Sequence, residues 1–227
     1  MSMRTPTETI ASLSALIPQL TRWIGYGLLL AVLASGGCDS SDSSPTDAYK
    51  ITVYYTALES FHGGAGETVY GRLSPGAESD NDVLGKYPES FVAAVQTEGA
   101  GRITSGSYAG RYLNWSYDVG YWLDTIPDNA YGSALVAFRT AAADPDVLAR
   151  GTSFKLVAPL IQDDGTPLDS ASASRFLSAS WVIQDQFTPG SGGPGHLDLY
   201  IGEEDRPDFT GSSPLYISLA DVAIQIQ

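Results

Sequence analysis

The chain has 227 residues, of which 43% are hydrophobic and 17% charged, a composition typical of a globular protein with room for one domain of moderate size. Its 12 basic and 26 acidic residues give a net charge of -14, which repels the phosphate backbone of nucleic acids and anionic membrane surfaces. We therefore expect no nucleic-acid partner. Abundant glycine, proline and tyrosine, without long helical runs, predict a mainly β fold.

Residues 1–37 are predicted to be a signal peptide. Arg4 and Arg22 precede an apolar run over residues 23–34, which is too short to span a bilayer of ~30 Å comfortably but suits the central region of an export signal. Small residues then precede Cys38, the only cysteine of the chain, and this arrangement resembles the cleavage site of bacterial lipoproteins. We expect lipidation of Cys38, with a plain secretory signal or a retained anchor as the alternative.

Residues 38–48 are a polar stretch rich in serine and aspartate, and we interpret them as a flexible linker that follows the lipidated cysteine. Residues 49–227 are then the folded domain. This organisation predicts a membrane-anchored lipoprotein of the bacterial cell envelope that faces the periplasm, with the lipid membrane as a partner of the N-terminal anchor.

The folded domain begins with an alternating pattern. The stretch YKITVYYTA places Ile51, Val53 and Tyr55 on one side, as expected of a half-buried strand. Short strand-like segments separated by Gly, Pro and Asp turns favour a closed barrel or a sandwich. The further segments are residues 91–97, 134–142, 153–159, 178–185, 196–202 and 215–219.

One helix and one long loop are also predicted. Residues 168–179 have the pattern of a short helix, with Asp169 or Ser170 as its N-cap and Phe176 as a residue to bury. Residues 61–81, rich in Gly, Glu and Ser, predict a long surface loop.

Several kinds of active site are disfavoured by the residues available. His62 and His196 lie in different segments without a second ligand at helical spacing, which argues against a His-based zinc site. The sequence also lacks a phosphate loop and a Gly-x-Ser-x-Gly motif. We therefore expect neither a metal nor a cofactor, with calcium bound by the acidic run Glu203-Glu204-Asp205 as the alternative.

Three aspartates lie beside strand-like segments. They are Asp144 in AAADPDVLARGTSFKLV, Asp185 in WVIQDQFTPG and Asp198 in GHLDLYIG, and each taken singly is typical of a turn cap or a loop organiser. Two aspartates brought close together would raise the pKa of one of them, and a carboxylic acid kept protonated in this way can protonate a leaving oxygen.

These segments resemble the three-aspartate (3D) domain of bacterial cell-wall proteins and the related catalytic domain of membrane-bound lytic transglycosylase A. The matching features are Asp144-Pro145 after an alanine-rich strand, the glycine-rich loop between Asp185 and Asp198, and VYYTALES as the opening strand. The resemblance implies a six-stranded double-psi β-barrel with long loops and a short helix. It also implies cleavage of peptidoglycan glycan strands.

The same resemblance implies catalytic roles. Asp198 would be the general acid/base, which protonates the leaving oxygen and then withdraws the proton from the 6-hydroxyl of the same sugar; Asp185 would be its partner and Asp144 a third, supporting carboxylate. His196 lies two residues before Asp198, on the same strand face, and is a candidate to bind substrate or tune the aspartate. Glu98, in QTEGAGRI, is a second candidate acid.

An aromatic segment over residues 108–122 offers surfaces for stacking on sugar rings. We expect Trp115 and Tyr200 to contact substrate and most of the other aromatic residues to be buried. The sequence therefore predicts a lytic murein transglycosylase or another enzyme that acts on a cell-envelope polysaccharide. The alternative is a non-catalytic envelope lipoprotein that binds peptidoglycan or another glycan.

Overall fold

The computed structural model describes residues 46–227. The predicted signal peptide (residues 1–37), Cys38 and the predicted linker up to residue 45 lie outside the described residues. Strand β1 (Thr46–Leu58) includes the last three residues of that linker. Within residues 46–227, no helix has the length and apolar character needed to cross a membrane.

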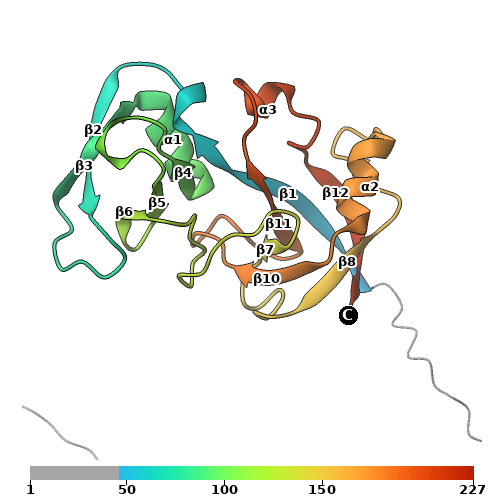
Figure 1. Ribbon diagram of the computed structural model, residues 1–227. Coiled ribbons are helices and arrows are strands. Elements are labelled where there is room, and N and C mark those ends of the chain that lie inside the picture. The colour runs from blue at the N-terminus through green and yellow to red at the C-terminus, as the bar shows by residue number, and fades with distance from the viewer. Residues whose placement is uncertain (1–45) are drawn as a thin grey trace, which may run out of the picture. The chain divides into compact units, whose positions relative to one another are not determined.

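Six strands close into a barrel (Figure 1). Their order is β1-β11-β7-β10-β8-β12, and β12 pairs back onto β1 to complete the circle. The predicted mainly β fold with a six-stranded double-psi β-barrel is confirmed. Besides β1, the barrel strands are β7 (Thr140–Ala142), β8 (Ser153–Val157), β10 (Trp181–Asp185), β11 (His196–Glu203) and β12 (Leu219–Ile226), and the two-residue β9 (Ile161–Gln162) pairs with β12.

A second sheet extends from the far end of β1. Ala57 and Leu58 of β1 pair with β4, so one long strand belongs to the barrel and to the second sheet. Helix α1 (Glu89–Glu98) packs against β1 and β4 on this side of the molecule (Figure 1). The sheet runs β3-β2-β6-β5-β4 and consists of β2 (Gly66–Arg72), β3 (Asp82–Pro88), β4 (Ala100–Arg102), β5 (Tyr112–Ser116) and β6 (Gly120–Asp124).

The core follows the predicted alternation of β1. Ile51, Val53 and Tyr55 are buried, as expected. Helix α2 (Ser170–Ser178) also forms where predicted: Asp169 caps it by accepting hydrogen bonds from the N–H groups of Ala171 and Ser172, and Phe176 is fully buried. The remaining short helical turns are η1 (Glu59–Phe61), η2 (Gly106–Tyr108) and α3 (Phe209–Ser212).

Two predictions of local structure were wrong. Residues 91–97 form most of α1 and not a strand, because Phe91, Val92 and Val95 bury one helical face and Gly99 ends the helix with a left-handed backbone, φ 88°. A seven-residue apolar run fits either structure. Residues 61–81 are not one long loop, because β2 pairs with β3 on one side and β6 on the other.

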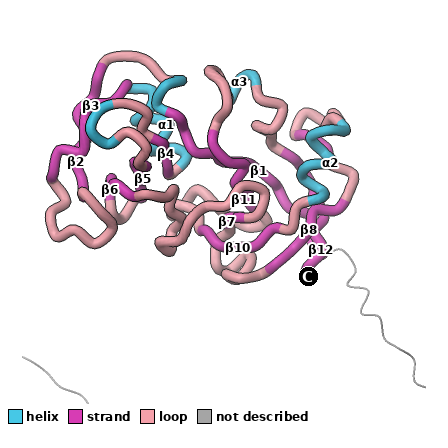
Figure 2. Tube along the Cα trace, in the orientation of Figure 1, coloured by secondary structure: helices cyan, strands magenta, loops and turns pink. Residues whose placement is uncertain are grey.

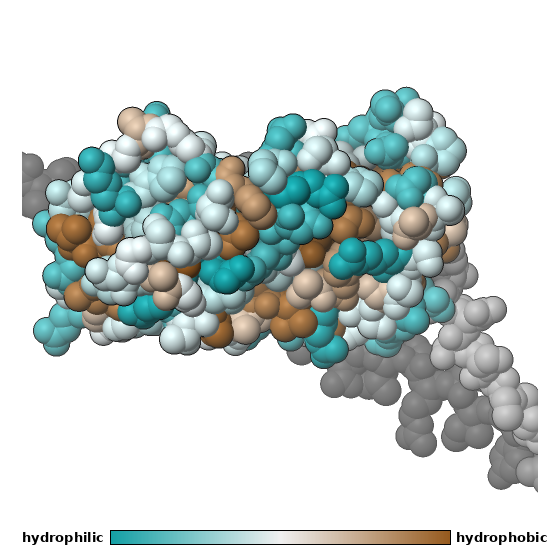
Figure 3. Space-filling view, turned by 45° about the horizontal axis from the view of Figure 1, so that its top comes forward, coloured by the Kyte–Doolittle hydropathy of each residue, from teal (hydrophilic) through white to brown (hydrophobic). Residues whose placement is uncertain are grey.

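Two strand boundaries also differ from the predictions. Only Thr140–Ala142 of the segment 134–142 is a strand, and Figure 2 shows the chain between β6 and β7 as loop. The predicted strand over 215–219 is replaced by β12, which starts at Leu219. Asp221 has a positive φ of 52°, and the buried residues on either side of it, Leu219 and Val222, are three positions apart instead of two. The sequence of this strand therefore does not show a regular alternation. On the surface, hydrophilic and hydrophobic residues are interspersed (Figure 3).

Candidate active site

Three neighbouring barrel strands bring two of the predicted aspartates onto one face. Ala142 of β7 is the register partner of Asp198 on one side and of Asp185 on the other. Because adjacent strands lie about 4.8 Å apart, the Cα atoms of the two aspartates are separated by roughly 10 Å, and their side chains emerge on the same side. Asp185, Asp198 and Ala142 all line one cavity, which we call the central cavity, with a volume of about 360 Å³.

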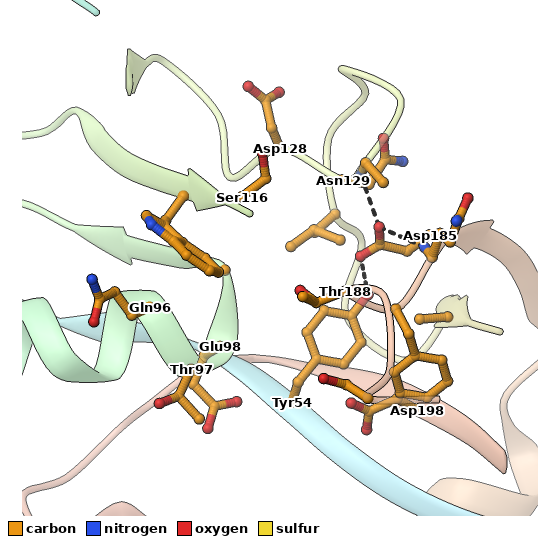
Figure 4. Close-up of a pocket in the computed structure, with 18 of the residues that line it drawn as sticks. Tyr54, Gln96, Thr97, Glu98, Ser116, Asp128, Asn129, Asp185, Thr188 and Asp198 are labelled. Carbon is orange, nitrogen blue, oxygen red and sulfur yellow. Dashed lines mark hydrogen bonds between the residues drawn. The ribbon is translucent and has the colours of Figure 1, made fainter. Parts of the chain in front are cut away.

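Asp185 is buried and held by three hydrogen-bond donors. The N–H groups of Ala130 and Gln186 donate to its Oδ1 at 2.8 and 2.9 Å, and the Tyr54 hydroxyl donates to Oδ2 at 2.8 Å (Figure 4). Burial raises the pKa of Asp185, while the three donors stabilise its charged form and oppose that rise. The arrangement fixes this carboxyl group rigidly in the wall of the cavity.

Asp198 has fewer partners. Its Oδ1 accepts a hydrogen bond from Thr52 Oγ1 at 2.8 Å, the register partner on β1. The side chain is partly buried, with its exposed part toward the cavity. Burial is the main cause that raises its pKa to about 7, and the negative charge of Asp185 adds to the rise, against the effect of Thr52. A carboxyl group with this pKa can donate a proton and take one back near neutral pH.

Glu98 faces the same cavity from the opposite side. It is the last residue of α1, it is 9% exposed, and its Oε2 accepts a hydrogen bond from the Tyr55 N–H at 3.3 Å. Burial raises the pKa of Glu98 to about 8, with contributions from the charges of Asp198 and Glu204. Figure 4 shows Glu98 and Asp198 on the two sides of Tyr54. The cavity therefore holds a second carboxyl group with a raised pKa, which comes from the end of helix α1.

His196 and Trp115 also line the central cavity. His196 Nε2 lies 2.9 Å from Thr52 Oγ1, so one hydroxyl contacts both His196 and Asp198. The imidazole packs against Phe187, with ring centroids 4.6 Å apart, and burial lowers the pKa of His196. At neutral pH this ring is therefore uncharged and able to hydrogen-bond as a donor or as an acceptor.

The other two predicted site residues lie behind the cavity wall. Asp144 Oδ2 accepts a hydrogen bond from the Gly193 N–H at 2.8 Å, which ties the glycine-rich loop to the end of β7. Tyr200 is buried, packs against Tyr54 with ring centroids 5.3 Å apart, and shares a 2.6 Å hydrogen bond with Thr56. Neither Asp144 nor Tyr200 is among the residues that line the central cavity. Tyr200 packs against Tyr54, which lines the cavity, and Asp144 holds the glycine-rich loop, which contributes Ser191 to the lining.

Two contacting residues were not singled out from the sequence. Thr52 and Tyr54 donate hydrogen bonds to Asp198 and Asp185 respectively. The sequence does contain a pattern that marks these two residues. Strand alternation puts Thr52 and Tyr54 on the face of β1 opposite to Ile51 and Val53. Polar residues on one face of an otherwise apolar strand mark the side that is turned toward a site.

The acidic run after β11 does not converge on one point. Glu203 pairs with Arg102 at 2.9 Å, Glu204 contacts His62 at 2.7 Å, and Asp205 pairs with Arg206 at 2.7 Å. Over residues 46–227, no three His, Cys, Asp or Glu side chains are grouped closely enough to hold a metal ion.

Two crystal structures of other proteins resemble this arrangement of barrel and second sheet. Escherichia coli MltA with bound chitohexaose superposes with a TM-score of 0.50 and 16% sequence identity, over 78% of this chain and 71% of that chain. A membrane-bound lytic murein transglycosylase from Agrobacterium tumefaciens gives a TM-score of 0.50 and 13% identity, over 78% of this chain and 73% of that chain. The chain shares the fold of these proteins.

The comparison agrees with one part of the resemblance drawn from the sequence, the barrel of lytic transglycosylase A. Membership of the three-aspartate family stays a prediction. No protein-family model matches the sequence, and no curated protein sequence does.

Proposed function

We propose that this protein is a lytic transglycosylase that cleaves the glycan strands of peptidoglycan. The observation that carries the proposal is Asp198, a carboxyl group with a pKa of about 7 at the base of the central cavity, beside the fixed carboxyl group of Asp185. The shared fold supports the same conclusion, because one of the similar structures holds chitohexaose, a chain of linked sugars.

In the proposed reaction, protonated Asp198 donates its proton to the glycosidic oxygen as the bond between this oxygen and C1 breaks. Positive charge develops at C1, and the nearby carboxylate of Asp185 stabilises it. Asp198, now ionised, withdraws the proton from the 6-hydroxyl of the same sugar while O6 attacks C1. The products are a shortened glycan and a 1,6-anhydro sugar end, no water is consumed, and Asp198 is protonated again.

The test uses the purified protein and purified peptidoglycan, with product analysis by mass spectrometry. We expect anhydro-muropeptides from the wild type and at least a 100-fold loss of their formation in Asp198→Asn, because the amide cannot exchange the proton. Products with a reducing end would indicate a hydrolase. Binding to the polymer without any product would favour the non-catalytic glycan-binding alternative.

We also propose that the protein works at the membrane of the cell envelope, anchored through a lipid on Cys38. The support is the sequence pattern around Cys38 together with a domain that starts within ten residues of it. Cell fractionation tests the anchor: Cys38→Ala is expected to move the protein from the membrane fraction to another fraction, and an unchanged membrane fraction would contradict the proposal.

A further inference from the structure

A second, larger cavity continues from the central cavity. Its volume is about 570 Å³, and it shares with the central cavity the residues Ser116, Trp122, 128–130 and 186–188. We call it the outer cavity. Because the two cavities share these walls, they form one groove, and a chain of sugars bound at the aspartates would extend into the outer cavity.

Trp122 lies in the wall shared by the two cavities and has two charged residues as neighbours. Arg72 of β2 is the register partner of Trp122 of β6, so the two side chains emerge next to each other on the same face of the second sheet. Trp122 Nε1 donates a hydrogen bond to Asp128 Oδ2 at 2.8 Å. All three residues line the outer cavity.

Both charged neighbours of Trp122 hold a polar atom without a partner. Arg72 Nε and Asp128 Oδ1 are buried and form no hydrogen bond that meets geometric criteria within residues 46–227. Burial, together with the neighbouring carboxyl group of Asp124, raises the pKa of Asp128 to about 6. The ion pairs of the described chain include neither residue, so Arg72 and Asp128 do not pair with each other. An unpaired buried donor and an unpaired buried acceptor destabilise a fold, and their presence beside the same indole in the wall of the outer cavity indicates a place for a ligand.

The charged residues that line the groove indicate which chemical groups the ligand carries. Among the described residues that line the two cavities, Arg72 is the only Lys or Arg, whereas five residues are acidic: Glu98, Asp118, Asp128, Asp185 and Asp198. The whole chain has a net charge of -14. An anionic group would be repelled by those of these residues that are ionised and attracted at one point, where a guanidinium group can bind a carboxylate with two parallel hydrogen bonds.

We propose that the outer cavity binds a sugar unit that carries a carboxylate. The sugar ring stacks on Trp122, a sugar hydroxyl donates to Asp128 Oδ1, and the carboxylate binds the Arg72 guanidinium. In peptidoglycan such a carboxylate comes from the lactyl group of muramic acid or from the acidic peptide attached to it. The inference rests on the proposed function, since it assumes that the adjoining central cavity receives the same glycan.

The test measures binding by isothermal titration to Asp198→Asn, in which the ligands are not cleaved. The ligands are neutral chitotetraose, a peptide-free tetrasaccharide with free lactyl carboxylates, its methyl ester, and the same tetrasaccharide with attached peptides. We expect the peptide-free acid to bind about 10- to 100-fold more tightly than its methyl ester, as charge-assisted hydrogen bonds would produce. If only the tetrasaccharide with attached peptides binds more tightly than the methyl ester, the carboxylate that binds Arg72 belongs to the peptide.

Substitution of Arg72 connects this preference to the proposed site. In the Asp198→Asn background, Arg72→Gln should remove the preference for the acidic ligands and leave chitotetraose binding unchanged, while Arg72→Lys should keep part of the preference. Arg206→Gln is the matched control, because Arg206 is exposed and outside both cavities. The methyl ester gives the same comparison without any change at Arg72, so a misfolded variant cannot decide the outcome.

Two results would overturn the inference. One is equal affinity for the acidic and esterified ligands; the other is a uniform loss for all ligands in Arg72→Gln. If the wild type still releases anhydro-muropeptides, only the role of Arg72 fails and the proposed function stands. If no glycan binds and none is cleaved, both proposals fail together.

Discussion

Glu98 offers a direct test of the electrostatics of the central cavity through protein stability. Its pKa is raised from 4.5 to about 8, so the folded protein binds more protons than the unfolded chain between these two values. The free energy of unfolding therefore falls as the pH rises through this window. The full effect corresponds to at most about 5 kcal/mol, at 1.36 kcal/mol per pKa unit, and water that enters the cavity reduces it.

Glu98→Gln removes this titration and keeps a side chain of nearly the same size, with an oxygen to accept from the Tyr55 N–H. We expect the wild type to lose stability from about pH 5 to about pH 8 more steeply than the variant, by up to about 1.4 kcal/mol per pH unit. Urea unfolding at several pH values measures the difference. Asp198 titrates in both proteins, so the difference between the two curves reports the titration of Glu98 together with its interaction with Asp198.

A matched control is Glu78→Gln, which changes an exposed glutamate in the loop between β2 and β3. We expect Glu78→Gln to follow the wild type. Equal pH dependence in the wild type and in Glu98→Gln would refute the reasoning, because it would mean that Glu98 is ionised in the folded protein without cost.

The remaining predictions concern the paired aspartates, the glycine-rich loop and a helix cap. Asp198 acts as an acid in its protonated form, so kcat/KM should fall as the pH rises through about 7. Asp185→Asn removes a negative charge that raises the pKa of Asp198, so this fall should move to lower pH. An unchanged pH profile would mean that the two groups do not interact. Gly192→Ala would place a Cβ atom 2.4 Å from Asp144 Oδ2, so we expect the glycine-rich loop to shift. Activity should then drop several-fold while the melting temperature changes little. Full activity would show that the position of the loop is unimportant. Asp169→Ala should lower the melting temperature by about 2–4 °C, because it removes the N-cap of α2. Asp169→Asn keeps an oxygen that can cap the helix and should not lower it. Equal melting temperatures for the two variants would argue against the cap.

The placement of α1 and of Glu98 illustrates what a local pattern leaves open. The run over 91–97 has the apolar content of a buried strand, and the glycine after Glu98 fits a strand end or a helix end. Packing of Phe91 and Val95 against Gly101, where a Cβ atom would lie only 2.5–2.6 Å from these side chains, fits the helical alternative. The helix then carries Glu98 into the cavity.

The sequence by itself determined the features that depend on neighbouring residues. Strand alternation located β1 and most of the barrel strands, and the cap of α2 followed from Asp169 and the residues after it. The glycine-rich loop between Asp185 and Asp198 was also visible, because its two ends are marked by strands and its composition allows a tight return.

Only the tertiary structure decided which side chains meet. Asp185 and Asp198 lie on the same face because β7, from an earlier part of the chain, inserts between their strands and pairs with both. Glu98 joins them because β1 continues from the barrel into the second sheet. Arg72 and Trp122 are fifty residues apart and become neighbours through strand pairing alone. Such contacts depend on long-range register, which no local periodicity encodes.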